Sequence, residues 1–84
     1  MTRDPGLVHL LRNTSVRDWE RALRRDGFLL KRKTGNSRFY AHPDGRLTDI
    51  HYHHGSDTLP RGTLASVLAA TRWTEADARR LGLL

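Results

Sequence analysis

Apolar side chains recur at helical spacing in the first third of the chain. Val16, Trp19 and Leu23 are three or four positions apart, so one face of a helix would carry all three into a core. Ser15 precedes them in a pattern typical of a helix N-terminus, and Gly27 follows them where a left-handed residue would end the helix. This stretch predicts an amphipathic helix whose opposite face is rich in arginine.

A second helical pattern lies in the C-terminal third, where Leu64, Val67 and Leu68 form a narrow apolar stripe among alanines. Two shorter helices are expected near the ends of the chain, one opening at Pro5 and one within residues 74–84.

Between the two long helices the pattern changes to short runs separated by turn signals. Three strands are expected, at Phe28–Arg32, Ser37–His42 and Leu47–His53. Gly35 supplies the positive φ of the first turn, and Pro43–Gly45 is a strong hairpin signal. The chain therefore predicts an α+β fold in the order α-β-β-β-α, with a three-stranded antiparallel sheet and helices on one face of it.

The length and composition narrow the class of protein. Residues 1–84 are enough for a single small domain. The absence of cysteine excludes disulfides and thiolate metal sites. No apolar run is long enough to cross a bilayer, and the apolar patch near the N-terminus is too short for a signal peptide. We expect a cytoplasmic protein with no membrane partner and no cofactor.

The charge is strongly positive for so small a domain. Fifteen Lys and Arg residues oppose nine Asp and Glu residues, which gives a net charge of +6 and a pI of 11.1. This excess favours a polyanionic partner, and nucleic acid is the first interpretation. Most of the bases are Arg, the better phosphate ligand, although an arginine-rich proteome would produce the same bias.

Several motifs occur in a distinctive order: "DGFLLKRKTGNSRFYAHPDGR", then "HGSDTLPRGTLASVL", then "TEADA". Together they resemble the HicA toxin family, also called YcfA-like proteins, over roughly Ser15 to Asp77. The resemblance implies a fold like that of double-stranded-RNA-binding domains, with residues 1–13 as an N-terminal extension and 74–84 as a short C-terminal helix. It also implies ribosome-independent cleavage of mRNA, a HicB-type antitoxin that covers the active face, and a role in a bacterial stress response.

The resemblance also implies an active site. In the family, the active residue is the histidine of a Gly-Ser-His turn, which acts as general base or acid on the RNA backbone. Counted back from Pro43, the corresponding residues here are Gly35, Asn36 and Ser37, so a serine occupies the position of that histidine. His54, beside a glycine, matches the family's second histidine.

RNA cleavage needs one group to take the 2′-hydroxyl proton and another to protonate the leaving oxygen. Histidine suits both roles because its pKa is about 6.5, whereas a lone serine cannot be the base at neutral pH. The proton carriers would then come from His42, His51, His53 and His54, which strand pairing is expected to bring close together. Two alternatives stay open for this cluster: a merely polar strand end, and a divalent metal bound together with Asp49.

Bases flank the first turn and are candidates for phosphate contact. Arg32, Lys33 and Arg38 stand on either side of Gly35 and Asn36, which complete this candidate RNA site. The alternative role for these bases is a charged strand edge that prevents pairing with other chains.

Aromatic residues divide between the core and the candidate RNA site. Phe39 and Tyr40 point to opposite faces of their strand, so one belongs in the core and the other can stack on a base. We assign the stacking role to Tyr40. Trp19 and Trp73 are expected in the core or as helix staples.

The leading hypothesis is a HicA-type toxin that cleaves mRNA and is held inactive by a HicB-like antitoxin. The first alternative is an RNA-binding or antitoxin-binding module that has lost catalysis through Ser37. The second alternative is a protein-interaction domain whose charge reflects composition alone.

Overall fold

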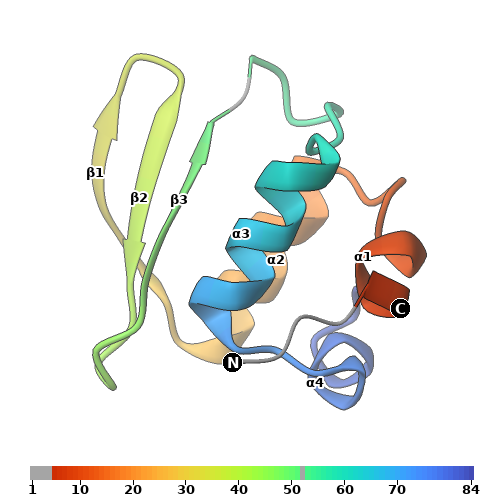
Figure 1. The fold of residues 1–84 in the computed structure, drawn as a ribbon. Coiled ribbons are helices and arrows are strands. Elements are labelled where there is room, and N and C mark those ends of the chain that lie inside the picture. The colour runs from red at the N-terminus through yellow and green to blue at the C-terminus, as the bar shows by residue number, and fades with distance from the viewer. Residues whose placement is uncertain (1–4, 52) are drawn as a thin grey trace.

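The computed structural model describes residues 5–51 and 53–84. Its elements are α1 (Pro5–Leu10), α2 (Val16–Asp26), β1 (Leu29–Thr34), β2 (Ser37–Ala41), β3 (Leu47–His51), α3 (Arg61–Thr71) and α4 (Glu75–Arg80). The three strands form one antiparallel sheet in the order β1-β2-β3, and α2 and α3 cover one face of it (Figure 1). The expected α+β fold, with helices on one face of a three-stranded sheet, is confirmed.

Two tight hairpins set the register of the sheet. Gly35 has a φ of +56° and opens the two-residue turn between β1 and β2, as in turns that need a left-handed residue at their first central position. Gly45, with a φ of +100°, closes the second hairpin. In this register Ser37, the first residue of β2, stands directly opposite His51, the last residue of β3.

The strand boundaries differ slightly from the expected ones. The first strand begins at Leu29 rather than Phe28, because the Phe28 N–H is used in ending α2 and donates to Leu23 O over 2.9 Å. Gly27 supplies the left-handed residue of that helix end, as expected. The third strand ends at His51 rather than at His53.

Aromatic stacking joins the helices behind the sheet. Val16, Trp19 and Leu23 of α2 are fully buried, and so are Tyr40 and Ile50 on the helix side of the sheet. The rings of Trp19 and Trp73 stack at a centroid distance of 6.0 Å. Both tryptophans therefore belong to the core, as expected.

The segments at the two ends of the chain also contribute to the core. Leu7 and Leu11, from the stretch expected to be an extension, are buried against the same cluster as the tryptophans. Helix α4 begins with a complete capping box between Thr74 and Asp77. No helix in residues 5–51 or 53–84 combines the length and the apolar character that a membrane span needs.

Asp26, at the end of α2, links three parts of the chain. Its carboxylate accepts from Trp73 Nε1 at 2.9 Å and pairs with Arg46 at 3.0 Å. Arg46 in turn lies over the Phe28 ring. This nearly buried network holds the lower end of the sheet in Figure 1, around the β2–β3 turn, against the helices.

Candidate catalytic and RNA-binding site

The residues at the opposite end of the sheet, beside the β1–β2 turn, form a pair of polar side chains. Ser37 Oγ lies 2.9 Å from His51 Nδ1 across the strands. The two residues are directly opposite in the register, and strand alternation places both on the face that the helices leave open. His51 is exposed, so the contact leaves its Nε2 accessible to a ligand.

A second polar pair lies beside the first. Asn36 Nδ2 is 3.1 Å from His53 Nδ1, and the His53 ring stands edge-on to the His51 ring at a centroid distance of 6.1 Å. Two imidazoles thus share this end of the sheet, each held through Nδ1 by a residue at the start of β2 or in the turn before it. Such a pair has the residue types that proton transfer to and from a phosphodiester requires.

The loop after β3 is tied to the start of α2. Asp57 accepts from the backbone N–H groups of His53 and His54 at 3.1 and 2.9 Å. These bonds, the His54 N–H first, hold the pKa of Asp57 below its ordinary value. The backbone of Gly55 accepts from Arg17 N at 2.9 Å, and a Cβ at Gly55 would lie 3.3 Å from the Arg17 guanidinium. Arg17 is therefore held close to the histidine loop.

The structure does not bring all four expected histidines together. His54 lies in the loop with an exposed side chain, three residues beyond the end of β3. His42 lies past the other end of β2, five residues from Ser37 and thus about 17 Å away along the strand. Its Nε2 donates to Asp26 O at 2.7 Å, and its ring packs edge-on to Phe28. The expected closeness of His42 to His51 is therefore wrong, because His42 belongs to the hairpin at the far end.

The bases around the first turn fall on different faces. Arg32 lies on the open face with its guanidinium 4.6 Å from the centre of the Phe39 ring. Lys33 and Arg38 are register partners on the helix side, where Arg38 donates to Glu20 at 3.3 Å. The three bases flank the turn as expected, but they do not form one patch.

Tyr40 corrects the expectation about stacking. Its side chain is 1% exposed, and its hydroxyl donates to Glu20. Burial raises the pKa of Tyr40, and the hydrogen bond to Glu20 adds to this effect. Tyr40 therefore cannot stack on an RNA base, and Phe39 is the aromatic residue on the open face.

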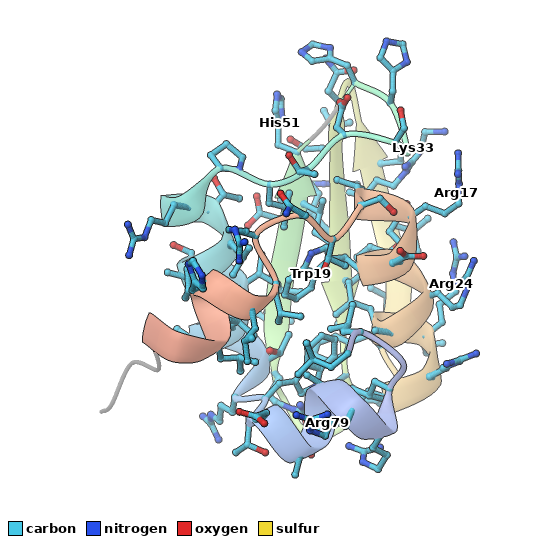
Figure 2. The ribbon with its side chains drawn as sticks, turned by 90° about the vertical axis from the view of Figure 1, so that its right-hand side faces the viewer. Arg17, Trp19, Arg24, Lys33, His51 and Arg79 are labelled. Atoms are coloured by element: carbon cyan, nitrogen blue, oxygen red, sulfur yellow. The ribbon has the colours of Figure 1, made fainter. Side chains whose placement is uncertain are left out.

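A basic surface runs along α2 toward the same end of the sheet. Figure 2 shows Arg17 and Arg24 on the outer side of α2, with Lys33 above them and His51 near the top of the same view. Arg79 lies at the opposite end. Arg17, Arg24 and Lys33 are all exposed. Their positive charge lies on the helix side of the end of the sheet that carries His51.

The described ranges, 5–51 and 53–84, contain no group of three or more His, Cys, Asp or Glu side chains arranged to hold a metal ion. The contacts of Ser37 with His51 and of Asn36 with His53 were not anticipated from the sequence. The signal for the first was present, because a tight turn around Asp44 fixes which residues of β2 and β3 stand opposite each other.

Comparison with known protein families gives a match. Residues 16–73, more than half of the chain, match the family model described as HicA toxin of bacterial toxin-antitoxin. The match runs from the start of α2 through the sheet and α3 to Trp73. The search of curated proteins gives no match.

Proposed function

Because this chain belongs to the HicA toxin family of bacterial toxin–antitoxin systems, we propose that it binds mRNA and cleaves it as an endoribonuclease until an antitoxin covers the site. Family membership implies the antitoxin partner. The RNA chemistry is supported by one observation above all: the His51 and His53 rings lie 6.1 Å apart, next to the turn where the family resemblance expects the active residue.

His51 has the position of a general base. When its Nδ1–H donates to Ser37 Oγ, the lone pair of Nε2 is left for the proton of an RNA 2′-hydroxyl. The 2′-oxygen would then attack phosphorus, and the bond from phosphorus to the 5′-oxygen would break. Ser37 thereby acts as a positioning residue that holds the imidazole in one tautomer.

His53 has the position of the complementary acid. As an imidazolium it would give its Nε2 proton to the departing 5′-oxygen, so that the products are a 2′,3′-cyclic phosphate and a 5′-hydroxyl. Asn36 can hold either protonation state of His53, because an amide presents a nitrogen donor or an oxygen acceptor to Nδ1. Arg17 and Lys33, on the basic surface beside this end of the sheet, would attract the phosphate backbone.

The test is cleavage of a defined RNA by the purified chain and by single histidine variants. His51→Ala and His53→Ala should each lower the rate about a hundredfold to ten-thousandfold, the usual contribution of general acid–base catalysis. His9→Ala, which removes an exposed histidine from α1, is the matched control and should leave the rate unchanged. Toxicity on expression without the antitoxin should follow the same order.

Two results would contradict the mechanism. Equal cleavage by wild type and by His51→Ala would remove His51 from the chemistry. Binding of RNA without cleavage by any variant would leave a binding module whose catalysis was lost through Ser37.

A further inference from the structure

The open face of the sheet carries a pocket next to the two imidazoles. Its volume is 420 Å³, and its lining includes Lys31, Arg32, Phe39, Leu47 and Asp49. We propose that this pocket is a nucleobase subsite, in which one unpaired RNA base stacks on the layer formed by Arg32 and Phe39. This inference rests on the proposed function, because it names the part of the RNA that the site holds.

The stacking layer is already assembled. The Arg32 guanidinium lies 4.6 Å from the Phe39 ring centre, so a planar cation covers a planar ring. Bases stack on aromatic rings and on guanidinium planes alike. Arg32 and Phe39 are register partners on β1 and β2, so the sheet keeps the two residues side by side before any ligand arrives.

An acceptor stands on the other side of the ring. Asp49 of β3 is the register partner of Phe39, and its carboxylate lines the same pocket. A carboxylate accepts hydrogen bonds from exocyclic amino groups, as it does from cytosine N4. Adenine, cytosine and guanine carry such a group and uracil does not, so Asp49 would favour the first three.

The proposed subsite lies next to the residues proposed to act on the RNA backbone. Ser37 and Phe39 are two residues apart on the open face of β2, and thus about 6.7 Å apart. His51 and Asp49 repeat this spacing on β3. A base seated on Phe39 would therefore belong to a nucleotide next to the phosphate at His51.

The features of the pocket favour a base over an apolar side chain of a protein partner. Leu47 and Leu29 are 69% and 54% exposed on this face, and a protein partner would also cover them. Arginine stacked on an aromatic ring also occurs at protein interfaces, so the charges at the rim of the pocket decide between the two partners. Lys31 and Arg32 lie at one rim of the pocket and Asp49 lies at the other. The two bases match the anionic phosphate of a nucleotide, and the carboxylate matches a base edge rich in hydrogen-bond donors.

The experiment measures binding of fluorescein-labelled six-nucleotide single-stranded RNAs to the full chain by anisotropy. Phe39→Leu keeps an apolar side chain but removes the ring, and it should weaken binding roughly five- to 150-fold, as loss of one base–aromatic stack does. Arg32→Lys keeps the charge but removes the plane, and it should also weaken binding at least severalfold. Arg79→Lys, at the opposite end of the molecule, is the matched control and should change affinity less than about twofold.

The identity of the base provides a second readout. RNAs that each carry one abasic position identify the base that binds the pocket. Wild type should bind more weakly when the abasic position is the one that would stack on Phe39. With that RNA, Phe39→Leu should cause no further loss of affinity. Wild type should disfavour uracil at that position. Asp49→Asn should reduce this preference, because an amide can both donate and accept. Circular dichroism of each variant checks that it folds.

The outcomes separate this inference from the proposed function. Salt-dependent RNA binding that is unaffected by Phe39→Leu and Arg32→Lys overturns the subsite alone. Binding that depends on Phe39 without cleavage supports the subsite and overturns the catalytic proposal. If Phe39→Leu weakens binding of the antitoxin but not of RNA, the subsite is overturned, since the face is then a protein interface. No RNA binding at low salt overturns both proposals.

Discussion

Ser37 and His51 face each other across β2 and β3, with Oγ and Nδ1 2.9 Å apart. The chain therefore has an imidazole within one hydrogen bond of the position where the family resemblance expects its active histidine. A lone serine cannot take a proton at neutral pH, but a serine can orient a histidine that takes the proton.

Ser37→Ala should lower the rate of RNA cleavage moderately. The variant loses the hydrogen bond that orients His51, a contribution of about 0.5–1.5 kcal/mol, which corresponds to a roughly two- to 13-fold slower reaction. RNA affinity should change little, so kcat falls while KM is preserved. If Ser37→Ala retains the full rate and His54→Ala abolishes it, the catalytic centre lies in the loop after β3 instead.

Ser37→His should raise cleavage and toxicity together. It places an imidazole at the position of the family histidine, next to the one already supplied by His51. RNA affinity should stay nearly constant, because Ser37 makes its contact with His51 and not with the basic surface along α2. Single-turnover cleavage and growth on induction measure the two effects, and a variant less active than wild type would count against this position.

The Asp57 loop should loosen in acid. The pKa of folded Asp57 lies below that of an unfolded aspartate, about 3.9, because the N–H groups of His54 and His53 stabilise its carboxylate. As the pH falls, the unfolded chain takes up this proton first, so the stabilisation is complete above about pH 5 and is lost as the pH passes through the folded pKa.

Thermal unfolding between about pH 6 and pH 2 measures this loss, and the comparison of wild type with Asp57→Ala isolates it from other carboxylates. The difference in melting temperature between the two should shrink steadily toward low pH. A difference that stays constant over the whole range would exclude the Asp57 carboxylate as its cause.

The pairing of Ser37 with His51 was predictable in principle from the sequence. The turn signal at Pro43–Gly45 identified the hairpin, and a tight turn aligns Ala41 with Leu47. Counting outward from that pair in an antiparallel ladder leads to Ser37 and His51. The same count places His42 at the turn and far from the site. The closeness of the four histidines in the sequence suggested, wrongly, that His42 lies near the other three.

Other features depend on packing and could not be read from the sequence. Lys31 is an extra residue in β1, and the register shift between Leu30 and Arg32 has no glycine or proline to announce it. The choice of Tyr40 over Phe39 for the core depends on Glu20, a buried carboxylate on α2 that accepts the tyrosine hydroxyl. The alternation of side chains along β2 predicts that Phe39 and Tyr40 lie on opposite faces of the sheet. The position of Glu20 on α2 determines which of the two rings is buried.

Tyr40→Phe should therefore lower stability and leave RNA binding unchanged. The variant removes a buried hydrogen bond to Glu20, which is worth about 1.5–3 kcal/mol for a charged partner. Denaturant unfolding measures the loss, and anisotropy with a short RNA measures the affinity. A loss of affinity in a folded Tyr40→Phe protein would restore Tyr40 to the RNA site.

The basic surface along α2 should determine how RNA binding responds to salt. Three variants, Arg17→Gln, Arg24→Gln and Lys33→Gln, each remove one charge from this basic surface, which is labelled in Figure 2. Where that charge neutralises a phosphate of a single strand, its removal should reduce the slope of log affinity against log salt by about 0.7. Arg79→Gln removes the same charge from the opposite end of the molecule and should leave the slope unchanged. Titrations of one RNA at several salt concentrations provide all the slopes. If Arg79→Gln lowers the slope as much as Arg24→Gln does, the RNA responds to the net charge of +6 as a whole and not to this surface.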